Sequence, residues 1–238
     1  MKNKVRILST TSLEPSLINK AKEQNIIIDV VSFVEIEIIR NENLSEAIKD
    51  LFGKQLNVVF TSANAVDAVR ALVTDVKPRW TMFCIEGNTR KAVSKYFGES
   101  EIKGTGKDAG TLAEAIVNEK SIKEIVFFCG NIRRDELPEK LTEAGITVKE
   151  IVVYDTTEKP KTITEQYDAI LFFSPSGVNS FFSVNKIEPD AVLFAIGDTT
   201  GNAIKEQTKN KIVVSEKPSK KYVLTKAIQY FQKQLITN

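Results

Sequence analysis

Short runs of Val, Ile, Leu and Phe recur along the chain and alternate with stretches of helical periodicity. Most runs are apolar at successive positions, which is typical of strands buried on both faces of a parallel sheet. Strands are predicted at residues 4–10, 25–33, 57–62, 81–87, 124–130, 147–154, 169–175, 191–197 and 211–216. Because helices between such strands cover both faces of the sheet, the predicted fold class is α/β.

The two halves of the chain are similar to each other. The matched stretches are VVFTSANAVDAV with LFFSPSGVNSFF (58–69, 171–182), CIEGNTRKAV with AIGDTTGNAI (84–93, 195–204) and DAGTLAEAI with KKYVLTKAI (108–116, 220–228). The first pair aligns Ser62 with Ser174, and the second aligns Gly87 with Gly197. Such repetition indicates two related domains, and the alternative is chance matching of short βα units.

The last unit of the second copy is found at the start of the chain. Residues 6–31 have the same plan of strand, turn, helix and strand as residues 126–153. One domain is therefore predicted to be inserted into the other, and two short crossing segments that pair side by side would form a hinge. The predicted limits are 1–33 with 160–238 for the outer domain, 39–154 for the inserted domain, and 34–38 and 155–159 for the linkers.

Composition excludes several classes of protein. The 238 residues, 42% of them hydrophobic, are enough to bury one large core or two modest ones. A formal net charge of +2 does not favour a nucleic-acid or membrane-surface partner, and no apolar run approaches the roughly 18 residues that span a bilayer. A soluble, cytoplasmic protein is predicted. Cys84 and Cys129 have no metal-ligand spacing and are expected to be buried free thiols.

Hydroxyl residues, asparagine and glycine follow nearly every predicted strand. Ligands of open α/β sheets bind beyond the carboxyl ends of the strands, where helix starts present unpaired N–H groups and a positive dipole end. The candidate turns are 9–11, 61–64, 87–89, 106–108, 130–132, 174–177 and 197–200. The same residue types are ordinary helix caps, so each turn has two interpretations. If the two matched sets face each other, they form a cleft suited to a large polyanion.

The chain has no histidine, which excludes further chemistry. A serine hydrolase needs a histidine base, and zinc sites use histidine or grouped cysteines. No Walker A loop is present, and Gly104-Thr105-Gly106 lacks the third glycine of a dinucleotide fingerprint. General acid catalysis is left to Tyr, Lys, a carboxyl group, bound water or the substrate itself.

Four motifs together point to a known family. They are FTSANAV (60–66), GNIRRDELPEKLTEAG (130–145) followed by the strand ending VVY (152–154), FFSPSGVNSF (172–181) and IGDTTGNAI (196–204). In the order and spacing of these motifs, the chain resembles the uroporphyrinogen-III synthase family over essentially its whole length.

The resemblance implies a fold and an activity. It implies two doubly wound parallel-sheet domains, flavodoxin-like, one inserted in the other and joined by a two-stranded linker, with the active site in the cleft. Such enzymes are hydro-lyases of haem biosynthesis that cyclise the linear tetrapyrrole hydroxymethylbilane to uroporphyrinogen III, with loss of water and inversion of the D ring. They use no cofactor and no metal. A monomer that binds this polycarboxylate through helix-start N–H groups is expected.

The resemblance also implies residue roles. Tyr154 matches a functional tyrosine whose phenol would hydrogen-bond or protonate the leaving hydroxyl, and a packed aromatic is the alternative. Arg134 matches an arginine of the family's glycine-containing turn, with a surface arginine as the alternative. The expected substrate-binding residues are Thr10, Thr61, Ser62, Asn64, Asn88, Thr89, Arg134, Ser174, Ser176, Gly177, Thr199 and Thr200.

Some positions depart from the family pattern. Asp198 stands where a proline is frequent and would either meet a polycarboxylate or cap its helix and point away. Arg133 replaces a common glycine, and Glu86 a small apolar residue. The alternative function is a non-catalytic two-domain protein that binds a small ligand, or a regulatory protein, with an interdomain cleft.

Overall fold

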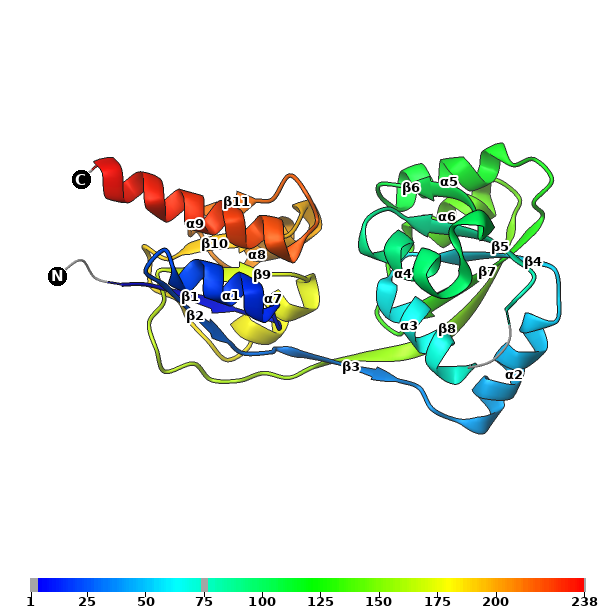
Figure 1. Cartoon of the computed structure of the whole chain (residues 1–238), viewed down its shortest axis with the longest axis horizontal. Coiled ribbons are helices and arrows are strands. Elements are labelled where there is room, and N and C mark those ends of the chain that lie inside the picture. Colours follow the sequence, from blue (N-terminus) through cyan, green and yellow to red (C-terminus); the bar gives the residue numbers. More distant parts are fainter. Residues whose placement is uncertain (1–3, 74–76, 238) are drawn as a thin grey trace. The chain divides into compact units, whose positions relative to one another are not determined.

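The structure is a computed structural model that describes residues 4–73 and 77–237. The chain divides into two compact units (Figure 1). Unit 1 comprises Met1–Glu35 with Thr157–Asn238, and unit 2 comprises Ile36–Thr156. The domain limits expected from the repeats stay a prediction, because compactness alone does not show that a unit folds independently.

Unit 1 contains a five-stranded sheet in the order β11-β10-β9-β1-β2 (Figure 1). All four neighbouring pairs in it are parallel. The strands are β1 (Val5–Ser9), β2 (Ile26–Val30), β9 (Ala169–Phe172), β10 (Val192–Ala195) and β11 (Ile212–Val214). The helices are α1 (Pro15–Lys22), α7 (Pro175–Phe182), α8 (Asp198–Gln207) and α9 (Lys220–Thr237).

Unit 2 is built around a six-stranded sheet in the order β3-β8-β7-β4-β5-β6. The pairs from β8 to β6 are parallel. The strands are β3 (Val34–Ile38), β4 (Leu56–Phe60), β5 (Trp80–Ile85), β6 (Ile102–Gly106), β7 (Glu124–Gly130) and β8 (Thr147–Glu158). The helices are α2 (Glu42–Phe52), α3 (Ala63–Leu72), α4 (Asn88–Phe97), α5 (Ala109–Asn118) and α6 (Glu136–Glu143), with a 3-10 turn at Glu99–Glu101.

Each sheet is covered on both faces, which confirms the doubly wound α/β prediction. In unit 1, Ile7 packs in a cluster with residues of α9, whereas its neighbour Leu8 packs in a second cluster with residues of α7 and α8. In unit 2, Phe60 packs with residues of α2, α3 and α4, whereas Val59 packs with residues of α5 and α6. Because successive strand residues point to opposite faces, both must be apolar, which explains the continuous apolar runs.

The two sheets have the same strand order. In unit 1, β1 and β2 lie next to β9, in the places that β7 and β8 occupy next to β4 in unit 2. The amino-terminal segment therefore completes the second copy of the repeat, as the sequence similarity predicts. Among the described residues, the sheet of unit 2 has one strand more than that of unit 1, the edge strand β3 beside β8.

The pattern missed β6 and recognised β3 only as a crossing segment. β6 has the sequence IKGTG, and glycine disfavours strands, so local propensity gives no signal. The predicted linkers are largely strand, because β3 includes residues 34–38 and β8 continues to Glu158. The prediction for the cysteines is confirmed, since Cys84 and Cys129 are free and buried.

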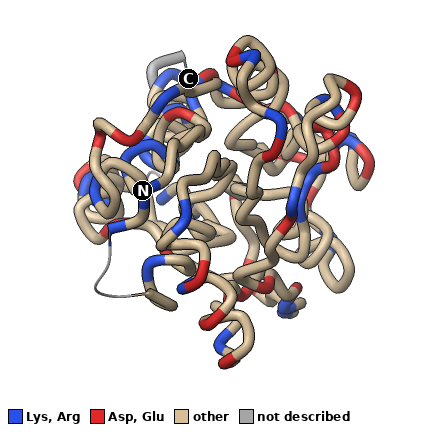
Figure 2. The backbone as a smooth tube through the Cα atoms, turned by 90° about the vertical axis from the view of Figure 1, so that its right-hand side faces the viewer, with Lys and Arg blue, Asp and Glu red and all other residues tan. Residues whose placement is uncertain are grey.

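Charges are mixed along the chain, and Figure 2 shows Lys and Arg interspersed with Asp and Glu. Within the part of the chain that the structure describes, no helix has the length and apolar character needed to cross a membrane. Any anionic ligand would therefore be bound by local groups and not by a general positive field.

Candidate functional site

The turns that carry the predicted site residues lie at one edge of each sheet, because parallel strands end on the same side. We call this the carboxyl edge. In unit 1 it includes the ends of β10, β9 and β1, which are neighbours in the sheet. In unit 2 it includes the ends of β7, β4 and β5 and the part of β8 that passes the end of β7. Apart from Arg134, the structure therefore brings the predicted residues of each unit together at its own carboxyl edge.

At the carboxyl edge of unit 1, the turns after β1 and β9 meet. Ser174 caps α7, and its hydroxyl accepts the N–H of Gly177 at 3.0 Å. A Cβ placed on Gly177 would lie 3.2 Å from the Ser174 Oγ and 3.8 Å from the Thr10 Oγ1. Both the N–H and the hydroxyl of Thr10 donate to the Leu171 carbonyl, at 3.1 and 2.8 Å. Thr10 thus joins the two strands and has its donors occupied, whereas the half-buried Ser176 lies in the first turn of α7.

The start of α8 is open by comparison. Gly197 is the N-cap and has no side chain to accept a hydrogen bond, and the first helical bond runs from the Gly201 N–H to the Gly197 carbonyl. The N–H groups of residues 198–200 precede this bond and are left for an external acceptor. Thr200 is buried, and Thr199 is half-buried beside it. Asp198 is the first helical residue and Gly197 is the cap, so of the two alternatives for Asp198 the one in which it caps α8 is wrong.

The matching positions of unit 2 also comprise one serine-capped and one glycine-capped helix start. Ser62 caps α3 by accepting the N–H of Asn64 at 3.2 Å, and Thr61 and Asn64 are half-buried. Gly87 caps α4 without a side-chain bond, and its φ of 85° lies in the left-handed region that favours glycine. Asn88 is exposed and Thr89 buried at the start of that helix.

The four helix starts therefore form two classes. Serine side chains occupy an N–H group at α3 and α7, whereas glycine caps leave three N–H groups unoccupied at α4 and α8. Unoccupied donors at a helix start, together with the positive end of the dipole, make an anion-binding site. The glycine-capped starts are thus better suited to hold a carboxylate than the serine-capped ones.

Tyr154 lies at the carboxyl edge of unit 2, where β8 passes the end of β7. Its side chain is 7% exposed and packs in the cluster that contains Phe60 and Phe128. Burial raises the pKa of Tyr154, and interactions of the phenol with the side chains of Ser62 and Asn64 act in the opposite direction. The phenol is therefore protonated at neutral pH and stands beside two polar groups that favour its ionised form.

Arg134 is not brought into this group. It is exposed on the loop between β7 and α6, and its side chain has no hydrogen bond or ion pair within the described residues. Its neighbour Arg133 pairs with Asp135 and with Glu150, donating from Nη2 to the Glu150 Oε1 at 2.8 Å. The arginine that departs from the family pattern is thus neutralised locally.

Sequence reasoning missed Lys220, the first residue of α9. Its ammonium donates to the Ser12 carbonyl at 2.9 Å and lies 5.9 Å from the centroid of the Phe173 ring. Ser12 follows β1 and Phe173 follows β9, so the cation stands at the carboxyl edge of unit 1. Burial lowers the pKa of Lys220, and the Glu14 carboxylate opposes that shift. The only sequence signal was a lysine at a helix start, where the dipole disfavours a cation.

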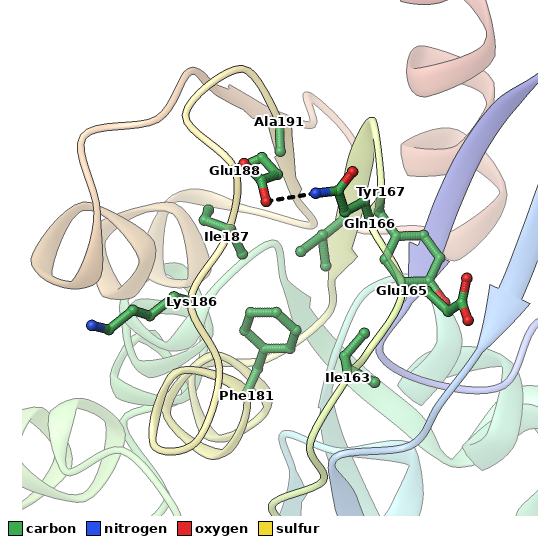
Figure 3. A pocket seen from close by; sticks show the side chains of 10 residues that line it. Ile163, Glu165, Gln166, Tyr167, Phe181, Lys186, Ile187, Glu188 and Ala191 are labelled. Atoms are coloured by element: carbon green, nitrogen blue, oxygen red, sulfur yellow. Dashed lines mark hydrogen bonds between the residues drawn. The ribbon is translucent and has the colours of Figure 1, made fainter. Parts of the chain in front are cut away.

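A pocket in unit 1 lies at the other edge of its sheet. Several of its lining residues directly precede the amino ends of β9 and β10. Figure 3 shows Phe181, Ile163 and Ile187 around the pocket. The Gln166 side chain donates a hydrogen bond of 3.0 Å to Glu188. None of the predicted site residues lines it. Within the described residues, no group of three or more acidic or cysteine side chains is placed to hold a metal ion.

Comparison with known proteins identifies a family. The family model described as uroporphyrinogen-III synthase HemD matches residues 16–224. A curated uroporphyrinogen-III synthase of Saccharomyces cerevisiae is 32% identical over 164 residues, which cover 57% of this chain and 59% of that protein. The match thus spans less than two thirds of the length of the yeast relative.

Solved structures with similar folds carry the same name. A mutant uroporphyrinogen III synthase from the extremely thermophilic bacterium Thermus thermophilus is 16% identical, with a TM-score of 0.66 over 98% of this chain and 100% of that one. A uroporphyrinogen-III synthetase from Helicobacter pylori is 18% identical, with a TM-score of 0.67 over 95% of this chain and 99% of that one. At these identities, the likeness shows a shared fold.

Proposed function

Because the chain belongs to the uroporphyrinogen-III synthase family, we propose that it cyclises hydroxymethylbilane to uroporphyrinogen III with loss of water and inversion of the D ring. The observation that carries this proposal is the buried Tyr154 phenol at the carboxyl edge of unit 2, beside Ser62 and Asn64. A protonated phenol is a suitable hydrogen-bond donor and acid for a leaving hydroxyl in a chain without histidine.

The proposed reaction requires little covalent help from the protein. The C–O bond of the hydroxymethyl group breaks while the pyrrole nitrogens supply the electrons, and the leaving hydroxyl takes a proton from Tyr154 and departs as water. Attack by the D ring on the resulting azafulvenium cation gives a spiro intermediate. Rearrangement and ring closure then release a proton, which returns to the phenolate. Positioning and electrostatic stabilisation dominate such a reaction.

The environment of Tyr154 suits this proton transfer. Burial keeps the phenol protonated before the reaction, and Ser62 and Asn64 favour the phenolate that forms when the proton leaves. Burial is the larger effect, so the pKa of Tyr154 is raised overall, which favours a phenol that hydrogen-bonds to the leaving hydroxyl and a phenolate that readily takes its proton back.

The glycine-capped starts of α4 and α8 are the proposed carboxylate sites. Each offers three N–H groups and at least one threonine in its first turn: Thr89 in α4, and Thr199 and Thr200 in α8. We add Lys220 to this set, because its ammonium stands at the carboxyl edge of unit 1 and keeps hydrogen-bonding capacity beyond its one bond to Ser12. Arg134 is proposed as a more exposed cation that meets the substrate only at its periphery.

The remaining predicted residues take supporting roles in this proposal. Thr10 and Ser174 hold the turns after β1 and β9 in shape, with the buried Gly177 donating its N–H to Ser174. Thr61, Asn88 and Ser176 contribute surface at the carboxyl edges. We propose that the reaction needs no cofactor, since the substrate supplies its own electrons. A cytoplasmic monomer stays the prediction for the whole protein.

The test is cyclisation of freshly generated hydroxymethylbilane by the purified protein, with separation of the oxidised uroporphyrin isomers. Type III product from the wild type, reduced in Tyr154→Phe and in Thr199→Ala, is expected. If a folded protein yields only the type I isomer that forms spontaneously, the synthase proposal is wrong, and the non-catalytic ligand-binding alternative takes its place.

A further inference from the structure

Gly130 ends β7, between the strand that carries Tyr154 and the turn that carries Ser62. In the sheet, β7 lies between β8 and β4. A side chain that starts on β8 and reaches the turn after β4 must therefore cross the end of β7. The Tyr154 phenol makes this crossing, since it interacts with the side chains of Ser62 and Asn64.

The Tyr154 ring occupies the space that a side chain on residue 130 would need. A Cβ placed on Gly130 would lie 2.5 Å from Cζ, 2.6 Å from Cε2 and 2.9 Å from the phenol oxygen of Tyr154. Gly130 is not among the described glycines with positive φ. Its backbone conformation is therefore open to alanine, and the three atoms nearest to a methyl group there all belong to the tyrosine ring or its hydroxyl.

A β-bulge at the same point turns Tyr154 inward. Cys129 pairs with Val152, whereas Gly130 pairs with Tyr154, so β8 contains one extra residue, Val153. Val153 and Tyr154 are consecutive, yet both are buried in the same hydrophobic cluster. Regular alternation would send them to opposite faces, and the bulge removes that alternation.

We propose that Gly130 is a positioning residue: its lack of a side chain, with the adjoining bulge, lets the Tyr154 ring cross the end of β7 and hold its phenol beside Ser62 and Asn64. Any side chain at residue 130 displaces the ring from this position. The inference rests on the proposed function for its catalytic consequence, whereas its geometric part stands on the contacts alone.

The test compares Gly130→Ala, Tyr154→Phe and the double variant, each with a thermal unfolding curve. Misplacement of a reacting group by about 1 Å costs up to about 100-fold in rate, so Gly130→Ala is expected to lower kcat about tenfold or more with KM changed less than about twofold. In the Tyr154→Phe background the phenol is already absent, and Gly130→Ala should lower kcat by no more than about twofold.

Gly53→Ala is the matched control. Gly53 follows α2 with a φ of −74°, and a Cβ placed there meets no atom within 4 Å. This variant should keep wild-type kcat and stability. If a folded Gly130→Ala protein also keeps the wild-type kcat, or if the double variant is about tenfold slower than Tyr154→Phe, the proposal is overturned.

Two further measurements cover the remaining outcomes. If Gly130→Ala does not fold, Gly130→Ala with Tyr154→Ala removes the collision and should restore folding, and failure to do so contradicts the proposed contact. If the wild type makes no type III product, ultraviolet titration of the Tyr154 phenol, assigned with Tyr154→Phe, still decides. A changed pKa of Tyr154 in Gly130→Ala supports the displacement of the ring, because gained solvent lowers the pKa and loss of Ser62 and Asn64 raises it. An unchanged pKa overturns it.

Discussion

Burial displaces the pKa values of several side chains in the direction of their neutral forms, among them Lys220, Cys84 and Cys129. The cysteines are neutral at physiological pH in any case, so their burial costs nothing there. Lys220 keeps a partly desolvated charge at a helix start, where the dipole also disfavours it. A group held at such a cost is a candidate for function, because stability alone does not favour it.

Replacing Lys220 tests its proposed role. Lys220→Met keeps much of the side-chain volume and removes the charge. We expect KM for hydroxymethylbilane to rise about tenfold with kcat nearly unchanged. This is a loss of about 1.4 kcal/mol of binding free energy, slightly below the range of a hydrogen bond to a charged group. Steady-state kinetics provide the measurement. Lys22→Met, at the exposed carboxyl end of α1, is the control, and equal effects of both substitutions would refute a specific site.

Alkaline pH should destabilise the protein through the two thiols. Burial raises the pKa of Cys84 and of Cys129 from the ordinary value of 9.0 to about 11. The native state thus holds each proton more tightly than the unfolded chain. The free energy of unfolding is therefore unaffected below pH 9 and falls as the pH rises from 9 to 11, by about 2 to 3 kcal/mol for each thiol.

Urea unfolding at several pH values between about 8 and 11 checks this prediction. Other groups also titrate in that range, so the informative quantity is the difference between the wild type and Cys84→Ala. The variant has a cavity, whose cost does not depend on pH, and its stability should fall less steeply. Parallel curves for the two proteins would contradict the role of the Cys84 thiol.

At the scale of elements, the start of each helix decides what the carboxyl edge can bind. The internal repeat aligns α3 with α7 and α4 with α8, and the caps follow this alignment, with serine at the first pair and glycine at the second. A serine cap satisfies an N–H group within the protein, whereas a glycine cap leaves it for a ligand. We propose that the serine-capped start of each pair serves structure and the glycine-capped start serves binding.

Adding a cap to α8 should block the proposed carboxylate site. Gly197 has φ −175° and ψ 176°, an extended conformation that serine adopts, and a Cβ there meets no atom within 4 Å. In Gly197→Ser the hydroxyl can accept an N–H of the first turn, so stability should hold or rise. A cap is worth about 1 kcal/mol, so KM should rise about fivefold.

Gly197→Ala separates the cap from the added bulk. It introduces a Cβ without an acceptor, so it should raise KM less than Gly197→Ser does. Kinetics and thermal unfolding of both variants provide the measurement. If the alanine variant raises KM as much as the serine variant, bulk and not capping is responsible, and the proposed use of these N–H groups is wrong.

At the scale of the molecule, each hydrophobic core is contained in one unit. The two clusters of unit 2 draw all their buried residues from positions 48–154, and the clusters of unit 1 draw theirs from both ends of the chain. We propose on this basis that the inserted segment is an independent folding domain. We expect that the carboxyl-terminal part of the outer segment does not fold alone, because it lacks β1, which pairs with β9 and supplies Ile7 and Leu8 to the two clusters of unit 1.

Two fragments test this proposal. Residues 36–156 contain the predicted domain 39–154 with the last three residues of its edge strand β3. They include Trp80, the chain's single tryptophan, which is buried and donates to the Leu51 carbonyl at 3.0 Å. Tryptophan fluorescence should report a cooperative urea transition for this fragment. Residues 157–238 alone should give the circular dichroism of a largely unfolded chain. A non-cooperative transition of the first fragment would refute the proposed domain.

The sequence by itself determined the features that a local pattern encodes, namely most strands, the α/β class, the shared strand order and the edge that carries the polar turns. Strands buried on both faces need continuous apolar runs, so most strands and the α/β class could be recognised. The repeat predicted the shared strand order, because equivalent units pair in equivalent ways. The polar turns could be placed at one edge of each sheet, because parallel strands share a direction.

Only the tertiary structure decided which of those polar groups remain available, because their partners lie far away in the chain. Thr10 has its hydroxyl occupied by Leu171, 161 residues later, and Lys220 reaches Ser12, 208 residues earlier. Likewise, β6 forms although its glycines give no strand signal, since Gly106 lets α5 approach closely: a Cβ there would lie 2.3 Å from the Leu112 nitrogen. Tyr154 was recognisable as a candidate from sequence, but its contacts with Ser62 and Asn64 depend on the bulge in β8 and on the position of Gly130 under its ring. Both arise only when β8, β7 and β4 pair.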